Sequence, residues 1–387
     1  MAKNERSPHD KAATRAHLEA YLESYPGQRG RVCRILLLHL HTNGLARIDD
    51  VYQRAERRAE WHVPQDPNVP SAQLWAADEA EVINRIVTDL AARYLSPAEV
   101  DSIVWAAHQR DEAKSVEALA RMPDVPLELI ARKVGQFCSL GGASGQVPVA
   151  PEGTLVALLR RCISERIDYI SVAKRYVTLQ DLSWLLERTL STEQGYGGVG
   201  GKAAGMLLAW AILRKAGHPD IALPSTVFLM TDAYTAFKDH NGLTELSDHK
   251  YEVLDRVRRN YPAIQAVFQN AEFPPRIANR LRAELARLGD VPLIVRSSSL
   301  LEDSFGAAFS GIYQSLFLLN QGSPEERLRA LLGAIAEIYS GVFSPDAISY
   351  RRRHDLLDHD ERMAVMIQPV VGKSNGKYYF PPTAGVT

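Results

Sequence analysis

The sequence predicts an α+β protein whose first part is mostly helical and whose second part combines strands with helices. Residues 1–190 carry one helical pattern after another. The composition changes at Ser191, where a glycine-dense stretch begins, and apolar runs of strand length follow at 291–295 and 363–371. We therefore expect two domains, a helical one over 1–190 and a strand-containing one over 191–387.

The composition is that of an ordinary globular protein. The 387 residues suffice for two or three domains, and 46% of them are hydrophobic and 24% charged. The net charge of −1 gives no argument for binding nucleic acid or an anionic membrane. The polar start lacks the apolar core of a signal peptide, and no apolar run approaches the roughly 18 residues that span a bilayer. Because the three cysteines are widely spaced, we expect a cytoplasmic protein without a disulfide framework.

The helices expected in the first part follow from apolar spacing and from start signals. Residues 78–95 repeat apolar side chains at helical intervals, and Ser96-Pro97-Ala98-Glu99 indicates a capping box with proline at the first helical position. His39 and His41 lie two residues apart, so on a helix they point in different directions, and we interpret them as ordinary helix residues. No combination of side chains in this part indicates catalysis. Further helices are expected at 126–140, 152–176 and 178–190.

A glycine-dense stretch, STEQGYGGVGGKAAG, leads into a hydrophobic helix that ends near Gly217. A loop of this kind at a helix N-terminus favours an anion, because the first N–H groups of the helix are unsatisfied. A P-loop would need glycine in place of Tyr196 and a hydroxyl residue in place of Ala203, so the sequence does not fit that motif. The residues alone leave two interpretations open: a phosphate-binding loop that contains Lys202, and an interdomain linker with a solvated lysine.

Alternating strand and helix patterns continue through the second part. A strand is expected at 225–230, followed by a helix at 231–239. Ser323-Pro324-Glu325-Glu326 is a second capping-box signal. The helix that starts at Ser344 ends in a basic cluster, Arg351 to His354, which we interpret as a solvated helix face because no aromatic platform for RNA accompanies it. Further helical segments are expected at 250–268 and 275–288.

The stretch VRSSSLLEDSFGAAFSGIYQSLFLLN, Val295 to Asn320, is the centre of the second part. A buried strand over 291–295 is expected to deliver Arg296 at its end, and a loop of small residues then leads to a strand over 313–319. Backbone N–H groups of such a loop can approach an anion, and the guanidinium adds a planar charge suited to phosphate. The alternative is a polar hairpin in which Arg296 pairs with Glu302 or Asp303. The small residues of the loop are Ser297, Ser298, Ser299, Ser304, Gly306, Ser310 and Gly311.

Two further strands are expected near the end of the sequence. Met363 to Val371 is an apolar run rich in β-branched residues, and Pro369 should end its hydrogen-bonded ladder. Lys377 to Thr387 also has the pattern of a strand.

Three motifs occur in order in this second part: GGKAAGM at Gly200–Met206, VRSS followed by the ED pair between Val295 and Asp303, and MAVMIQPVV at Met363–Val371. Together they resemble the nucleotide-binding domain of the phosphoenolpyruvate synthase and pyruvate phosphate dikinase family. The resemblance implies an ATP-grasp-type domain, here incomplete, that binds ATP with Mg²⁺ for phosphoryl transfer to a histidine on a separate domain. It is strong over 190–387 and weaker over the helical first part.

The resemblance also implies roles for individual residues. Lys202 and Arg296 would hold the phosphates and so serve catalysis. Glu302 and Asp303 match the family's ED pair and would order the loop. The resemblance assigns no residue of this sequence as a protein ligand to a metal. The other nucleotide-binding positions would be Gly200, Gly201, Gly311 and Ser315, with Gln368, Pro369 and Val370 at the purine.

Three elements of the family have no counterpart in these 387 residues. They are the late Glu and Gln-x-Arg that bind magnesium, ribose and phosphates, the phosphohistidine domain, and the pyruvate-binding barrel. We therefore expect the N-terminal portion of a dikinase-type phosphotransferase, with ATP as ligand and the missing domains as partners. The alternative is a non-catalytic regulatory or interaction protein, in which a helical domain is fused to a degenerate half of an ATP clamp.

Overall fold

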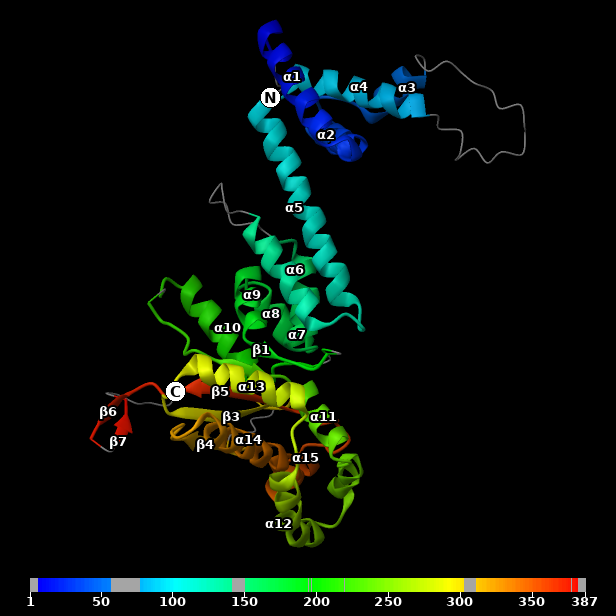
Figure 1. Cartoon of the computed structure of the whole chain (residues 1–387). Coiled ribbons are helices and arrows are strands. Elements are labelled where there is room, and N and C mark those ends of the chain that lie inside the picture. Colours follow the sequence, from blue (N-terminus) through cyan, green and yellow to red (C-terminus); the bar gives the residue numbers. More distant parts are fainter. Residues whose placement is uncertain are drawn as a thin grey trace. The chain divides into compact units, whose positions relative to one another are not determined.

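The computed structural model describes residues 6–56, 77–140, 150–193, 195, 197–218, 220–302, 311–376 and 378–381. The chain forms two compact units, Met1–Glu112 and Ala113–Thr387 (Figure 1). The predicted α+β class is confirmed. The boundary between the two units lies at residues 112/113. The domain boundary expected at residues 190/191 is a different one and remains a prediction.

The first unit consists of helices packed around a small apolar core. Ser96 and Glu99 form the predicted capping box, because the Glu99 carboxylate accepts the Ser96 N–H at 2.8 Å and the Ser96 hydroxyl accepts the Glu99 N–H at 3.2 Å. Among the helices described, none is long and apolar enough to cross a bilayer. The unit contains α1 (Pro8–Ser24), a 3₁₀ turn (Pro26–Gln28), α2 (Arg29–Thr42), α3 (Ile48–Glu56), α4 (Ala77–Tyr94) and the start of α5 (Pro97–Arg121).

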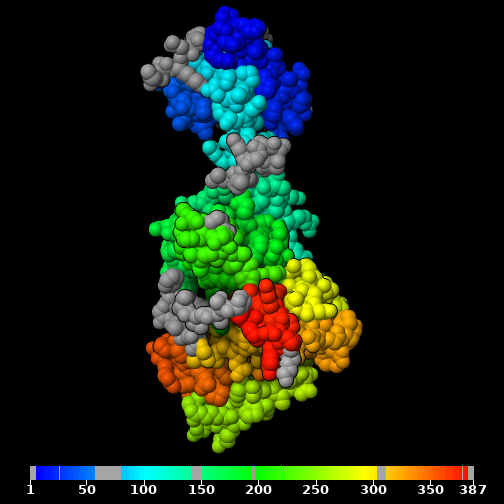
Figure 2. Space-filling model, turned by 90° about the vertical axis from the view of Figure 1, so that its left-hand side faces the viewer, coloured from blue at the N-terminus to red at the C-terminus, as the bar shows by residue number. Residues whose placement is uncertain are grey.

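The second unit is built on a five-stranded sheet in the order β1-β2-β5-β3-β4. β1 runs parallel to β2, and the other neighbouring strands are antiparallel. A separate hairpin, β6 with β7, follows β5, and this C-terminal part (red) lies at the surface in Figure 2. The strands are β1 (Thr189–Leu190), β2 (Val227–Leu229), β3 (Leu293–Ser299), β4 (Ser315–Leu318), β5 (Met363–Pro369), β6 (Lys373–Asn375) and β7 (Tyr378–Phe380).

Helices cover the two faces of the five-stranded sheet, because apolar side chains alternate along its central strands. Val227 and Leu229 of β2 pack in one core, and Phe228 between them packs in the other. Figure 1 shows the two groups of helices on opposite sides of the sheet. The helices on the Phe228 side are α6 (Leu127–Ser139), α7 (Glu152–Cys162), α8 (Ile167–Ala173), α9 (Leu179–Glu187) and α10 (Gly201–Lys215). The α-helices on the other side are α11 (Thr231–His240), α12 (Leu254–Asn270), α13 (Pro275–Leu288), α14 (Pro324–Ser340) and α15 (Pro345–Arg353). Two 3₁₀ helices, η3 (Thr244–Tyr251) and η4 (Gly341–Phe343), lie on that side as well.

Some expected elements differ from the structure. The helix expected over 152–176 is two helices, because the chain leaves α7 after Cys162 and the Ser164 hydroxyl accepts the Arg166 N–H. In the last expected strand, β7 is shorter than predicted and residues 382–387 lie outside the described part. The basic cluster is not uniformly solvated, because Arg351 is 2% exposed and donates to the carbonyls of Val342 and Ala347.

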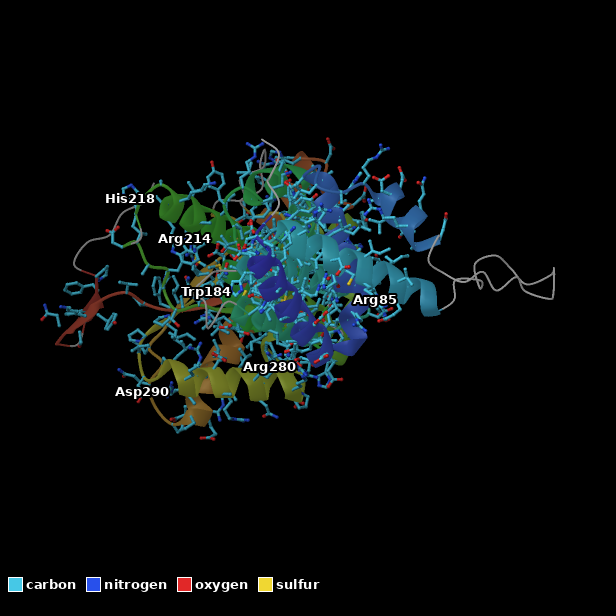
Figure 3. The ribbon with its side chains drawn as sticks, turned by 90° about the horizontal axis from the view of Figure 1, so that it is seen from above. Arg85, Trp184, Arg214, His218, Arg280 and Asp290 are labelled. Carbon is cyan, nitrogen blue, oxygen red and sulfur yellow. The ribbon has the colours of Figure 1, made fainter. Side chains whose placement is uncertain are left out.

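α10 is fixed to α9 by an ion pair between the half-buried Arg214 and the buried Asp181. Arg214 donates two hydrogen bonds to Asp181, whose side chain is 1% exposed. The Arg214 guanidinium lies 4.7 Å from the centre of the Trp210 ring, and the centres of the Trp210 and Trp184 rings are 5.9 Å apart. Figure 3 labels Arg214 and Trp184. This contact matters because the first turn of α10 carries the candidate site.

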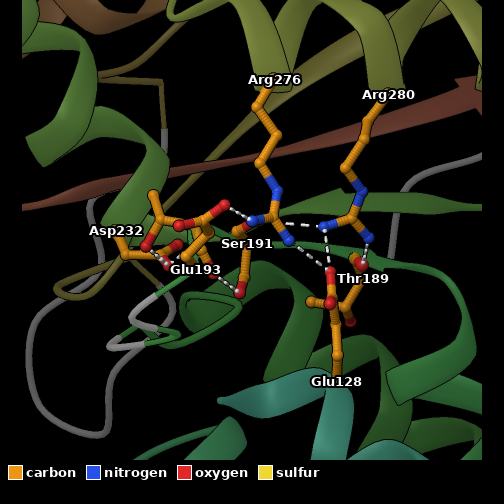
Figure 4. A network of polar contacts seen from close by, with 8 residues as sticks. Glu128, Thr189, Ser191, Glu193, Asp232, Arg276 and Arg280 are labelled. Atoms are coloured by element: carbon orange, nitrogen blue, oxygen red, sulfur yellow. Dashed lines mark hydrogen bonds and ion pairs between the residues drawn. The ribbon is translucent and has the colours of Figure 1, made fainter. Parts of the chain in front are cut away.

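Two arginines of α13 hold the edge of the sheet against α6. Arg276 and Arg280 pair with Glu128 at 3.0 and 3.1 Å. Arg280 also donates to the carbonyl oxygens of Thr189 and Ser191, so it satisfies two backbone acceptors in and just after β1 (Figure 4). The short strand β1 is therefore anchored by a side chain as well as by β2.

Candidate functional site

The candidate site lies where the first turn of α10 meets β3. Lys202 Nζ is 2.7 Å from Glu302 Oε1 and donates to the Ser297 hydroxyl at 3.0 Å. The Lys202 side chain is 19% exposed and that of Glu302 only 2%. The resemblance assigned Lys202 to phosphates, and here its ammonium is held by a carboxylate and a hydroxyl of this chain.

Close approach of the two segments explains the pair of glycines before Lys202. A side-chain carbon at Gly200 would lie 1.6 Å from the Ser298 carbonyl oxygen, and one at Gly201 would lie 1.5 Å from that of Glu302. Gly200 also has φ +80°, a conformation that other residues rarely adopt. The Ser298 hydroxyl accepts the Ala203 N–H at 3.1 Å and donates to the Val199 carbonyl at 2.8 Å. Both glycines are thus required by packing against β3.

Arg296 lies within β3, not at its end as the sequence led us to expect. The strand continues to Ser299 because Ser297, Ser298 and Ser299 all pair with β5. Arg296 lies directly opposite Ser315 of β4 and Met366 of β5. Among the described residues, the Arg296 side chain makes no hydrogen bond or ion pair, and Glu302 pairs with Lys202 instead. The alternative pairing of Arg296 with Glu302 is therefore wrong, and Asp303 lies outside the described residues.

Near Arg296, strand β4 presents exposed side chains on the sheet face on which α10 packs. Opposite Arg296 and Ile294 lie Ser315 and Phe317, so all four share one face. Phe317 is 71% exposed, whereas its neighbours Leu316 and Leu318 pack against the core on the other face. We did not identify Phe317 from the sequence. Period-two alternation from Ser315 would have placed it on the Arg296 face.

The connection between β3 and β4 is described only at its two ends. Gly311 has φ +77° and no atom within 4 Å of where its side chain would begin. Gly311 is exposed at the end that leads to Ser315. Ser304, Gly306 and Ser310, which the sequence placed in the small-residue loop, lie outside the described residues.

The end of β5 does not offer every group expected at a purine. The Val370 N–H donates to the Pro292 carbonyl at 2.8 Å, and the Val370 carbonyl accepts the Tyr379 hydroxyl at 3.2 Å. Both backbone groups of Val370 are therefore bonded within the chain, and its assignment to the purine stays a prediction. The Gln368 side chain is 4% exposed and donates to the Thr226 hydroxyl at 2.9 Å. Pro369 has no N–H and can supply only its carbonyl and apolar surface.

Two hollows adjoin the glycine-rich segment. A small one of about 120 Å³ is lined by Gly200, Gly201, Arg166 and Glu302, among others. A larger hollow of about 820 Å³ is lined by Gly197 and Gly198, among others. Its lining contains four arginines and three carboxylates, which makes it mildly cationic: Arg160, Arg161, Arg166, Arg362, Glu165, Asp358 and Asp360.

A second buried carboxyl group lies near Glu302. Glu361 is 5% exposed, and its Oε1 accepts the Tyr313 hydroxyl at 3.4 Å. Burial raises the pKa of Glu361 to about 7, and the charge of Glu302 acts in the same direction. The hydroxyl of Ser299 and the charge of Arg351 act against this rise in pKa.

Metal ligands of protein origin do not gather in this region. Within the described ranges, no group of three or more His, Cys, Asp or Glu side chains is placed to hold a metal ion. Glu302 is already engaged by Lys202, Ser297 and the Ser299 N–H.

Comparison with known proteins identifies residues 197–387 of the second unit. Residues 197–387 match the family described as "Pyruvate phosphate dikinase, AMP/ATP-binding domain". The chain is also 29% identical over 172 residues to rifampicin phosphotransferase of Streptomyces sviceus. That similarity covers 43% of this chain and 18% of the relative, so the chain spans less than a fifth of the relative's length. The resemblance inferred from the three motifs is confirmed, and residues 197–387 belong to the AMP/ATP-binding domain family of pyruvate phosphate dikinase.

Proposed function

We propose that the second unit binds ATP for a phosphotransferase, with Lys202 and Arg296 on the phosphates. One observation carries this proposal: α10 packs on the sheet face that presents Arg296, and its first turn brings the Lys202 ammonium to Ser297, the residue next to Arg296 in β3. Phosphoryl transfer requires mainly positioning and neutralisation of charge, and two cations near a helix N-terminus supply both.

The remaining contacts of the proposed site follow from this face of the sheet. Ser315 lies opposite Arg296 and has an exposed hydroxyl side chain for a phosphate oxygen. Gly311 leaves open space at the entry to β4, and Gly200 and Gly201 let the α10 turn approach β3. Phe317 of β4 offers an aromatic surface for the base. Gln368 and Pro369 lie on β5, on the other side of Ile294 in the sheet. Val370 contributes apolar surface.

The phosphoryl acceptor would be a histidine on a domain outside this chain, as in a dikinase-type kinase. Because the described carboxylates do not form a metal site, any Mg²⁺ would be held mainly by the phosphates of ATP, whose charge it would offset. We assign no further step to it. The relative's name gives rifampicin as that protein's substrate, but the match spans 18% of the relative, so we do not transfer this acceptor. We place the protein in the cytoplasm.

A second candidate function is a non-catalytic regulatory protein with a helical region and a degenerate ATP site. Two observations favour it: Lys202 is already neutralised by Glu302, and both backbone groups of Val370 are bonded within the chain. A nucleotide would have to compete with the first of these contacts.

Titration calorimetry and thermal shift with ATP, with and without Mg²⁺, distinguish the two functions. A ligand at 100 times its Kd should stabilise the wild type by about 2.7 kcal/mol. Arg296→Ala should lose most of this effect, because Arg296 has no structural partner among the described residues. Arg282→Ala, which removes an exposed arginine of α13, should behave like the wild type. Absence of any ATP effect on the wild type would favour the regulatory function.

A further inference from the structure

A chain of buried polar contacts leads inward from Lys202. Glu302 accepts hydrogen bonds from the Ser299 N–H at 2.9 Å and from the Ser297 hydroxyl at 3.1 Å, and its own N–H donates to the Ser299 hydroxyl. The next residue, Leu300, donates its N–H to the Arg362 carbonyl at 3.3 Å, so the segment that carries Glu302 lies beside the segment that carries Glu361. Two carboxyl groups, 1% and 5% exposed, are therefore buried on neighbouring segments.

Glu361 is enclosed by groups from several elements. The Tyr313 hydroxyl, just before β4, donates to its Oε1, and Oε2 has no hydrogen-bond partner among the described residues. The charge of Arg351 from α15 acts on it, and the Tyr234 hydroxyl from α11 also lies within electrostatic range. Asp360 and Arg362, its neighbours in sequence, pair with each other. Glu361 thus has no ion-pair partner of its own among the described residues.

We propose that Glu361 is a positioning residue of the nucleotide site: it responds to the charges of Glu302 and Lys202 on the neighbouring segments, and it takes up a proton when phosphates bind there. The inference rests on the proposed function. The proton comes from solvent or buffer and forms an O–H bond on the Glu361 carboxylate, with no change in oxidation state.

The direction of the effect follows from the charges. Lys202 offsets the negative charge of Glu302, and Glu302 raises the pKa of Glu361. Phosphates bound at Lys202 add negative charge next to Glu302, so they favour the neutral form of Glu361. By linkage, neutral Glu361 must favour phosphate binding by the same factor. Nucleotide affinity therefore falls as Glu361 loses its proton.

Calorimetry in two buffers of different ionisation enthalpy measures this proton uptake. At pH 7.5, ADP binding to the wild type should take up roughly half a proton if the pKa of Glu361 rises by about one unit. Glu361→Gln, which mimics the neutral acid, should remove that uptake, so that only the titration of the phosphates changes its affinity between pH 6 and 8.5. Over the same range the wild type should weaken up to about tenfold relative to this variant. The comparison cancels the titration of the phosphates themselves, whose own pKa is near 6.

Two more variants keep the test decisive. Tyr313→Phe removes a hydrogen bond that lowers the pKa of Glu361, so it should move the pH midpoint of affinity upward. Glu284→Gln, in the exposed α13 pair with Arg287, should match the wild type. Equal proton uptake by wild type and Glu361→Gln would overturn the inference while leaving the proposed function intact. If the wild type binds neither ADP nor ATP, the proposed function itself fails.

Discussion

Lys202 Nζ and Glu302 Oε1 form a 2.7 Å ion pair that joins the first turn of α10 to the chain just beyond β3. Both side chains are largely withdrawn from water, so removing one leaves the other charge buried and uncompensated. The pair therefore has a structural role whether or not a nucleotide is present.

The first prediction concerns the stability of this pair. Lys202→Met should lower the free energy of unfolding by about 3 kcal/mol, because Glu302 loses its counter-charge in a buried setting. The double variant Lys202→Met/Glu302→Gln should recover most of that loss, since no unpaired charge remains. Urea denaturation followed by circular dichroism measures both. Additive losses in the double variant would show that the two groups do not interact.

The second prediction separates two glycines of the same helix. Gly201→Ala should destabilise the second unit by about 3 kcal/mol or more, because its new carbon would lie 1.5 Å from the Glu302 carbonyl oxygen. Gly205→Ala is the matched control: nothing lies within 4 Å, and alanine in a helix interior is favoured by about 1 kcal/mol. Thermal unfolding of the two variants should shift in opposite directions. Similar shifts would contradict the close approach.

The third prediction tests Phe317 as the surface for the base. Phe317→Ala should weaken ATP about tenfold, because stacking of a base on an aromatic ring is worth on the order of 1–3 kcal/mol. Affinity for tripolyphosphate, which has no base, should not change. Tyr25→Ala, which removes another exposed aromatic ring, is the control. Equal weakening of both ligands would indicate damage to the phosphate site instead.

The fourth prediction is a pH dependence of stability set by Glu361. Its pKa is raised to about 7 in the folded protein, against an ordinary value of 4.5. The folded state therefore holds the proton more tightly, and this contribution is fully present below pH 4.5 and is lost as pH rises through 7. Over that window the wild type should lose about 3 kcal/mol relative to Glu361→Gln. Denaturant titrations at pH 5, 6, 7 and 8 measure the difference, and a constant difference would contradict it.

Local signals in the sequence predicted much of the fold. Ser323 and Glu326 form the second predicted capping box, and α14 begins at Pro324 as its pattern required. The helix predicted at 275–288 has the same bounds as α13. These elements could be predicted because caps and helical periodicity act between residues a few positions apart.

Long-range contacts account for what the sequence did not reveal. Three consecutive serines resemble a loop, but pairing with Met363–Val365 extends β3 through them, so tertiary context overrides local preference. The partner of Glu302 is a lysine one hundred residues earlier in the chain. The family motifs identified Lys202 and Arg296, but only the structure distinguishes the neutralised lysine from the arginine that has no partner among the described residues.

The position of β1 bears on how the protein can be dissected. The family match begins at residue 197, whereas β1, Thr189–Leu190, is the sheet's edge strand and is anchored by Arg280. Helices α6–α9 supply much of the apolar layer that covers Phe228 and Met366. The family match and the compact unit thus begin at different residues, 197 and 113. A gene fragment cut at the family boundary would expose the edge of β2 and favour aggregation, whereas one that keeps residues 113–387 would retain both apolar cores that pack on the sheet.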